Sequence, residues 1–350
     1  MNGSIDWEKF ILRIDNSVLI APCLKFVLYL DSSDDTGILD FYERAMEALA
    51  DSITHYQTEN MKKRANFQAQ ARTIVPTWFK RPRGNKDYFI ALSSDPQEQG
   101  GSPSTIELRV HRRPWEELAP EQIESRKSNW RILFEQQGCK FSPLASALRV
   151  TLPLNHALAD PERLLSWVLG FKLVKDWPFL SGHCGYALNH HEAIASSATR
   201  EQMQKRIGSL CLRYPGLDWH NVGGVEARLL HYDAVWMERT GYFLPLIKRV
   251  NWLSLIGKSA IAYLGGATAL RESLSTDVRI GLHALEHGML VQAGNAPQLG
   301  DLGHRDFLPA YRSVAKLLRP VRLESIPGLG RGFTDEAANE WLNAFDKEYN

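Results

Sequence analysis

The sequence predicts an α+β protein with mixed or antiparallel sheets and packed helices, and three observations support this fold class. Segments with alternating apolar residues are interspersed with segments of helical periodicity along the 350 residues. The order strand, helix, strand, strand occurs in the first half of the chain and recurs loosely in the second. A hydrophobic content of 44% is ample for the core of one large domain or of two smaller ones.

The first half begins with a predicted strand at 24–31, which is rich in aromatic and β-prone residues. An amphipathic helix is predicted at 38–57, because apolar residues recur there every three or four positions. Two further strands, at 87–93 and 105–112, flank a polar loop that contains glycine and proline.

The second half repeats this order with a strand at 147–154, a helix at 160–177 and a strand at 183–191. The helix has a strong start signal, since Asp160 is a preferred N-cap residue and Pro161 suits the first helical position. These similar halves suggest two loosely related α/β lobes.

A capping box at Thr199 and Gln202 predicts the start of the next helix. Further downstream the sequence predicts a strand, then helical segments on either side of a Gly-Gly pair, then two more helices: 251–257, 260–264, 267–274, 308–320 and 334–348. We expect residues 1–350 to form a single unit, with lobes at 1–115 and 144–350 and a connector at 116–143.

Composition gives no general case for binding nucleic acid or a membrane, because 41 basic residues balance 40 acidic ones. The N-terminal segment lacks the apolar stretch of a signal peptide, and no apolar run is long enough for a transmembrane helix. The cysteines are widely spaced and are expected to be reduced and mostly buried: Cys23, Cys139, Cys184 and Cys211. We therefore expect a cytoplasmic protein.

The most specific catalytic pattern is HALEH, residues 283–287, which matches the inverted zinc-peptidase signature. That chemistry needs a helix, because the spacing of four then places both imidazoles on one face. Residues 278–285 alternate as a strand does, Gly288 follows, and another apolar run begins. We therefore expect a hairpin without a metal, and keep a zinc-dependent hydrolase using His283, Glu286 and His287 as an alternative.

Two glycine-containing segments resemble phosphate loops without completing the pattern. Gly257-Lys258-Ser259 ends like a P-loop, but Trp252 stands where the first glycine is needed, so Ser259 is expected to cap a helix. Residues 291–301, VQAGNAPQLGD, are expected to shape the backbone, with Gly294 ending a strand. We predict no cofactor and no catalytic residue.

Two charged segments in the first half could bind a partner. Residues 61–86 carry eight basic residues and no acid, with aromatic residues between them. Such a composition is typical of surfaces that bind nucleic acid or an acidic protein. An acidic segment lies at 31–43, where acids also suit a helix N-terminus. The candidate partner-binding residues are Asp31, Asp34, Asp35, Trp78, Arg81 and Arg83. An ordinary solvated surface remains the simpler explanation.

Four blocks occur in order in the C-terminal third: VNWLSLIG (250–257), YLGG (263–266), VQAGNAPQLGD (291–301) and LPAYRSVAKLLRPVR (308–322). In these blocks the sequence resembles the TsiT-like family of type VI secretion immunity proteins, formerly a domain of unknown function. The resemblance is best over 245–322 and extends diffusely back to about residue 24. It does not include the basic stretch at 61–86.

The resemblance implies a non-enzymatic protein that binds and neutralises a cognate secreted effector toxin and so protects the producing cell. For a relative in the family, the partner resembles a nuclease toxin. We expect the toxin to be encoded by a neighbouring gene, and expect neither nucleic acid nor a membrane as partner. The alternatives are the zinc hydrolase and a nucleic-acid-binding protein that uses residues 61–86.

Overall fold

The computed structural model describes residues 5–14, 17–30, 35–61, 63–69, 71–80, 88–94, 104–111, 145–190, 197–219, 229–231, 234–240 and 244–348. The predicted connector, 116–143, lies outside these ranges.

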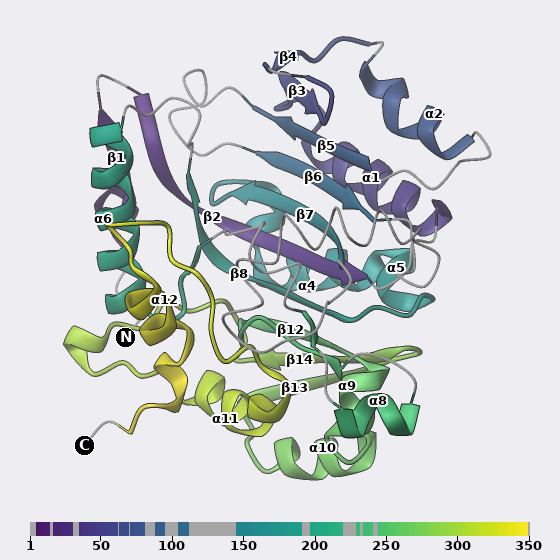
Figure 1. Cartoon of the computed structure of the whole chain (residues 1–350), viewed down its shortest axis with the longest axis vertical. Helices are drawn as coiled ribbons and strands as arrows, with labels where there is room; N and C mark the ends of the chain where they lie inside the picture. The colour runs from purple at the N-terminus through teal and green to yellow at the C-terminus, as the bar shows by residue number, and fades with distance from the viewer. Residues whose placement is uncertain are drawn as a thin grey trace.

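The architecture centres on one sheet of 12 strands, which confirms the predicted α+β class (Figure 1). Its order is β13-β14-β12-β8-β2-β7-β6-β5-β3-β4, with β1 paired to β2 and β9 to β8. All these pairings are antiparallel except that of β8 with β9. The strands are β1 (Leu12–Ile14), β2 (Ser17–Leu30), β3 (His55–Thr58), β4 (Ala65–Asn66), β5 (Tyr88–Ser93), β6 (Thr105–Val110), β7 (Ser146–Pro153), β8 (Ser181–His190), β9 (Asp218–Trp219), β12 (Leu253–Gly257), β13 (Ile280–Leu285) and β14 (Gly288–Ala293).

A small second sheet pairs β10 (Leu230–His231) with β11 (Leu244–Pro245). The helices are α1 (Asp35–Leu49), α2 (Ile74–Lys80), α4 (Pro161–Gly170), α5 (Lys172–Lys175), α6 (Ser197–Arg213), α8 (Ala234–Thr240), α9 (Lys258–Tyr263), α10 (Ala267–Ser275), α11 (Pro309–Leu318) and α12 (Asp335–Leu342).

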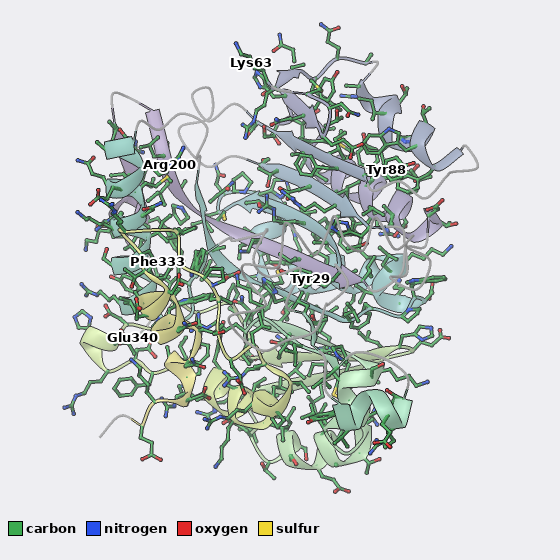
Figure 2. The ribbon with its side chains drawn as sticks, in the orientation of Figure 1. Tyr29, Lys63, Tyr88, Arg200, Phe333 and Glu340 are labelled. Carbon is green, nitrogen blue, oxygen red and sulfur yellow. The ribbon has the colours of Figure 1, made fainter. Side chains whose placement is uncertain are left out.

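Strand β2 lies at the centre of the sheet and pairs along most of its length with both β7 and β8. Its side chains alternate between the two faces. Phe26 and Leu28 enter the core beneath α1, α4, α5 and α11, which we call the α1 core. Val27 and Tyr29 enter the core beneath α6 and α12, which we call the α6 core; Figure 2 labels Tyr29 on β2 and Phe333 of the same core. Helices thus cover both faces of the sheet.

Strands from before and after the predicted connector alternate within this sheet. β2 precedes the connector, yet both of its long neighbours, β7 and β8, follow it. A unit built from residues 145–348 alone would therefore lack the strand between β7 and β8.

The helix predicted at 38–57 is correct only in its first part. Helix α1 ends at Leu49, where the Ser52 hydroxyl donates to the Leu49 carbonyl oxygen. Residues 55–58 form β3 instead, because pairing with β5 satisfies their backbone groups better than an exposed helical turn would.

The helix predicted at 160–177 begins as expected, with Asp160 accepting from the Arg163 backbone N–H at 3.0 Å. It is broken at Phe171, whose extended backbone separates α4 from α5.

The predicted capping box at Thr199 is wrong, because α6 already begins at Ser197 and Thr199 lies inside it. Other predicted ends of helices and strands are confirmed. The Thr334 side chain caps α12, and Gly265 and Gly266 separate α9 from α10 with φ values of 94° and 100°, which favour glycine. Gly294, with φ 86°, follows the end of β14 as predicted.

Three of the cysteines lie in the described residues as free, buried thiols: Cys23, Cys184 and Cys211. Burial raises the pKa of the Cys23 thiol to about 12, so this sulfur is a poor nucleophile at neutral pH. Within the described part of the chain, the helices are too short or too polar to cross a membrane.

The central position of β2 predicts that the two proposed lobes do not fold separately. We expect fragments 1–115 and 144–350, expressed individually, to show no cooperative thermal transition by near-UV circular dichroism, because each would expose unpaired strands. Mixing the two during refolding should restore the transition. A cooperative transition for 144–350 alone would contradict this expectation.

Candidate functional site

The HALEH segment forms the predicted hairpin, in which β13 and β14 pair and Glu286 and His287 make the turn. The ring of His283 lies on β13 and its Nε2 is 3.1 Å from the Gln292 side-chain oxygen on β14. His287 Nε2 lies 3.5 Å from its neighbour Glu286. The helix that the zinc-peptidase signature requires is therefore not formed here. No group of three His, Cys, Asp or Glu residues elsewhere in the described ranges could hold a metal ion.

The Gly257-Lys258-Ser259 segment joins β12 to α9, and Gly257 rather than Ser259 is the N-cap residue. The predicted cap was wrong because α9 starts at Lys258, two residues before the position that would follow a Ser259 cap. A side chain at Gly257 would lie 2.1 Å from the Phe179 carbonyl oxygen, so glycine here allows close backbone packing. This close approach accounts for the glycine without a phosphate.

Two of the candidate partner-binding residues lie in the described part of the chain. Asp35 begins α1, which is the usual place for an acid at the positive end of a helix. Trp78 lies in α2 and packs against Tyr88 with a ring-centroid separation of 5.2 Å, which uses part of its surface within the fold. The others, Asp31, Asp34, Arg81 and Arg83, fall outside the described residues. Their role in binding stays a prediction.

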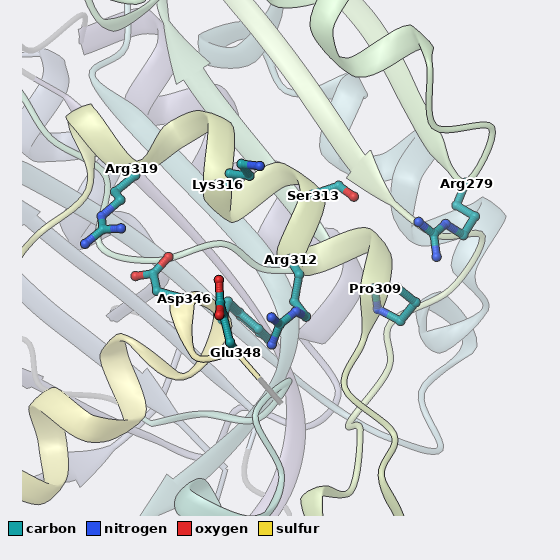
Figure 3. Close-up of a pocket in the computed structure, with 9 residues that line it drawn as sticks. Arg279, Pro309, Arg312, Ser313, Lys316, Arg319, Asp346 and Glu348 are labelled. Carbon is teal, nitrogen blue, oxygen red and sulfur yellow. The ribbon is translucent and has the colours of Figure 1, made fainter. Parts of the chain in front are cut away.

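A groove of about 450 Å³ lies along α11 (Figure 3). Figure 3 shows Arg312, Lys316 and Arg319 along the helix, Arg279 beyond its N-terminal end, and two acids of the C-terminal segment beside it. The lining residues are Arg279, Pro309, Arg312, Ser313, Lys316, Arg319, Phe345, Asp346 and Glu348. Four cations therefore share this groove with two carboxylates.

Part of the groove's charge is compensated locally. Arg279 forms an ion pair with Asp277 at 2.6 Å, and Asp346 forms an ion pair with buried Arg322. Lys316 and Arg319 are exposed, and within the described residues their side chains make neither a hydrogen bond nor an ion pair. Lys316 in the last turn of α11 and its C-cap residue Arg319 thus present two positive charges that the described part of the fold does not use.

One rim of the groove is a tightly bonded turn between α10 and β13. Asp277 accepts hydrogen bonds from the backbone N–H and side chain of Arg279 and, at 2.9 Å, from the Ser313 hydroxyl of α11. These bonds hold the pKa of the Asp277 carboxyl below its ordinary value, and the hydrogen bond from the Arg279 side chain lowers this pKa the most. Val278 projects from this turn with 98% of its surface exposed. The turn therefore holds an apolar side chain in water on a fixed backbone.

Behind α12, a cluster of buried charges centres on Asp218 of β9. Lys248 Nζ donates to Asp218 Oδ1 at 2.6 Å, and His183 Nε2 lies 3.2 Å from Oδ2. Lys25 Nζ is also 2.6 Å from Oδ2, as an ion pair without good hydrogen-bond alignment. These groups come from β2, β8, β9 and the segment before β12, and all are buried.

Burial and charge act against each other in this Asp218 cluster. Burial lowers the pKa of Lys248 to about 8 and that of His183 to about 4, although Asp218 raises both. Burial raises the pKa of Asp218, but Lys248 and Lys25 lower it more, so the carboxyl is held well below its usual range. The two lysines share one carboxylate, and His183 is neutral near pH 7.

Aromatic rings connect this cluster to the floor of the groove. The Arg249 guanidinium lies 4.2 Å from the ring centre of Trp341 and 4.4 Å from that of Phe345. Phe345 lines the groove and packs against Tyr311 of α11. The Tyr311 hydroxyl accepts from the Gln298 backbone N–H, within the 291–301 segment. This segment therefore supports α11 from behind, in line with its predicted structural role.

The sequence interpretation treated α11 as part of the fold and missed its outer face. A signal was present, since Arg312, Lys316 and Arg319 are spaced by four and three residues, opposite the buried positions Tyr311, Val314 and Leu318. Arg279 and the Asp218 cluster carried no such signal, because their partners are distant in the sequence.

Comparison with known proteins adds two findings. The family model described as TsiV, "Type VI immunity for VRR-NUC", matches residues 133–345. The structure is similar to that of the Pseudomonas aeruginosa T6SS protein PA0821, with a TM-score of 0.66 and 16% sequence identity. The match covers 94% of this chain and 83% of that one, and it shows a shared fold. No curated protein is significantly similar in sequence.

The buried histidine predicts an acid-sensitive stability. The pKa of His183 is lowered from 6.5 to about 4, so between these values the unfolded chain binds the proton that the folded protein does not. The free energy of unfolding should therefore fall as the pH drops from 6.5 towards 4, by up to about 3 kcal/mol from this group.

Urea denaturation at a series of pH values would measure this slope, and His183→Gln should flatten it between pH 6.5 and 4.5. The two proteins are compared by the pH dependence of their free energies of unfolding, because the substitution also changes stability at neutral pH. An unchanged slope in the variant would show that His183 is not the responsible group.

Proposed function

This chain belongs to the TsiV family of type VI immunity proteins, and we propose that it binds a cognate VRR-NUC effector and neutralises it. The observation that carries the proposal is the family match over residues 133–345, which is more than half of the chain. The matched region contains β7 to β14 and α4 to α12, and so includes the groove along α11 except for its lining residues Asp346 and Glu348. The name of the family describes its effector as VRR-NUC, which supports a nuclease toxin as the partner.

We propose that the protein acts by binding rather than by catalysis. The zinc-hydrolase alternative depended on a helical HALEH segment, whereas His283 lies on a strand and is bonded to Gln292. The glycine of the P-loop-like segment packs against the backbone of residue 179. Both candidate motifs therefore have structural roles. A protein that inhibits its effector by binding agrees with the family assignment.

We infer that the effector is encoded by a neighbouring gene and that the complex forms in the cytoplasm of the producing cell. Buried, free cysteines accord with a reducing compartment. We propose a protein partner, without nucleic acid or a membrane.

The proposal predicts that the purified protein stops DNA cleavage by its cognate VRR-NUC effector at an equimolar ratio. Activity should fall linearly with added protein until the two are equal, because a tight inhibitor titrates its target. A gel assay of plasmid cleavage, with size-exclusion chromatography of the mixture, measures both effects.

The matched control is a VRR-NUC effector from a different effector–immunity pair, which should remain active. A roughly tenfold excess of a tight inhibitor saturates its target. If the cognate effector neither binds this protein nor loses activity at that excess, the proposed function is wrong.

A further inference from the structure

We propose that the cognate effector docks an acidic segment into the groove along α11, with Val278 as the apolar contact at its rim. The inference rests on the proposed function and deepens it by naming the surface and the chemistry of the partner segment. Three observations carry it: the uncompensated charges of Lys316 and Arg319, a groove that these residues line together with Arg279, and an exposed apolar side chain, Val278, on the fixed turn next to Arg279.

The charge of the groove favours an acidic partner. Arg279 and Asp346 each have an opposite charge beside them, so they contribute little net field. Lys316 and Arg319 lack such a partner among the described residues, while Glu348 is the remaining acid of the lining. Complementary charge of this kind accelerates association and selects among partners.

Val278 provides the apolar component. A fully exposed valine gives the free protein no stability, because its side chain stays in water. The turn that carries it is nevertheless fixed by the bonds of Asp277 to Arg279 and to Ser313. Burying a side chain that is already held in place costs little conformational entropy, so such a residue makes an efficient contact.

The Ser313–Asp277 bond also fixes the turn relative to α11. Arg279 of this turn and the cations of α11 line the same groove, and exposed Val278 directly precedes Arg279 in the turn. The groove volume of about 450 Å³ is enough for a few partner side chains. Three of its cations, Arg279, Lys316 and Arg319, are exposed, an arrangement better suited to a partner surface than to an enclosed small anion.

The main test is charge reversal with the double variant Lys316→Glu/Arg319→Glu. We expect the association rate with the effector to fall at least roughly tenfold at low salt, and its dependence on salt to weaken. Val278→Ala should weaken the affinity by roughly fivefold to thirtyfold, mainly through faster dissociation. Surface plasmon resonance at several salt concentrations measures these rates.

The matched control is Lys175→Glu/Arg200→Glu, which makes the same charge change on α5 and α6. These helices contribute no residue to the groove along α11 (Figure 1), and Figure 2 labels Arg200. Its affinity should stay within about twofold of the parent protein. Thermal denaturation of each variant confirms that it is folded before binding is measured.

The outcomes separate this inference from the function on which it rests. If the parent protein binds no effector, the proposed function fails. If the parent binds and the Lys316/Arg319 double variant binds equally fast and tightly, the docking surface is wrong while the function stands. Saturable binding of inorganic phosphate that the double variant abolishes, with effector binding unchanged, would assign the groove to a small anion and overturn the inference.

Discussion

The carboxylate of Asp218 balances two buried lysines, and the arrangement of the central strands depends on this balance. An isolated ammonium group in an apolar interior costs several kcal/mol, so Lys25 and Lys248 can be buried only where they reach this carboxylate. Lys25 is on β2 and faces the α6 core. Because side chains alternate along a strand, a shift of β2 by one residue would move the lysine into the α1 core, away from any charge. The pairing of β2 with β7 and β8 is thereby restricted to one register.

The same interior supports the outer surface along α11. Arg249 stacks on Trp341 and Phe345, and Phe345 contacts Tyr311 on the inner face of α11. On the other side, the Ser313–Asp277 bond ties the helix to the turn that carries Val278. The surface residues of α11 therefore stand on a helix whose position is set by packing on one side and by this hydrogen bond on the other. Such a base suits an inhibitor, because a preorganised surface loses little entropy when it binds.

Local sequence patterns predicted the elements whose partners are nearby. The hairpin at 280–293, the cap at Asp160 and the glycine break between α9 and α10 all follow from a few adjacent residues. The strand at 55–58 was missed because its helical periodicity is overridden by pairing with β5. The Asp218 cluster joins residues as far apart as Lys25 and Lys248, and no local pattern links such positions. The outer face of α11 was visible as a spacing of cations, but its groove depends on Phe345 and Arg279, which only the tertiary fold brings near.

The place of β2 in the sheet limits how this lineage can diversify. The family model begins at residue 133, yet the strand between β7 and β8 comes from residues 17–30. A recombination event that replaced the N-terminal coding region would have to supply another long strand, apolar on both faces, with a cation opposite Asp218. Point substitutions on the exposed side of α11 meet no such requirement. With the proposed docking surface on α11, new specificities are therefore more accessible through substitutions on that surface than through exchange of gene segments.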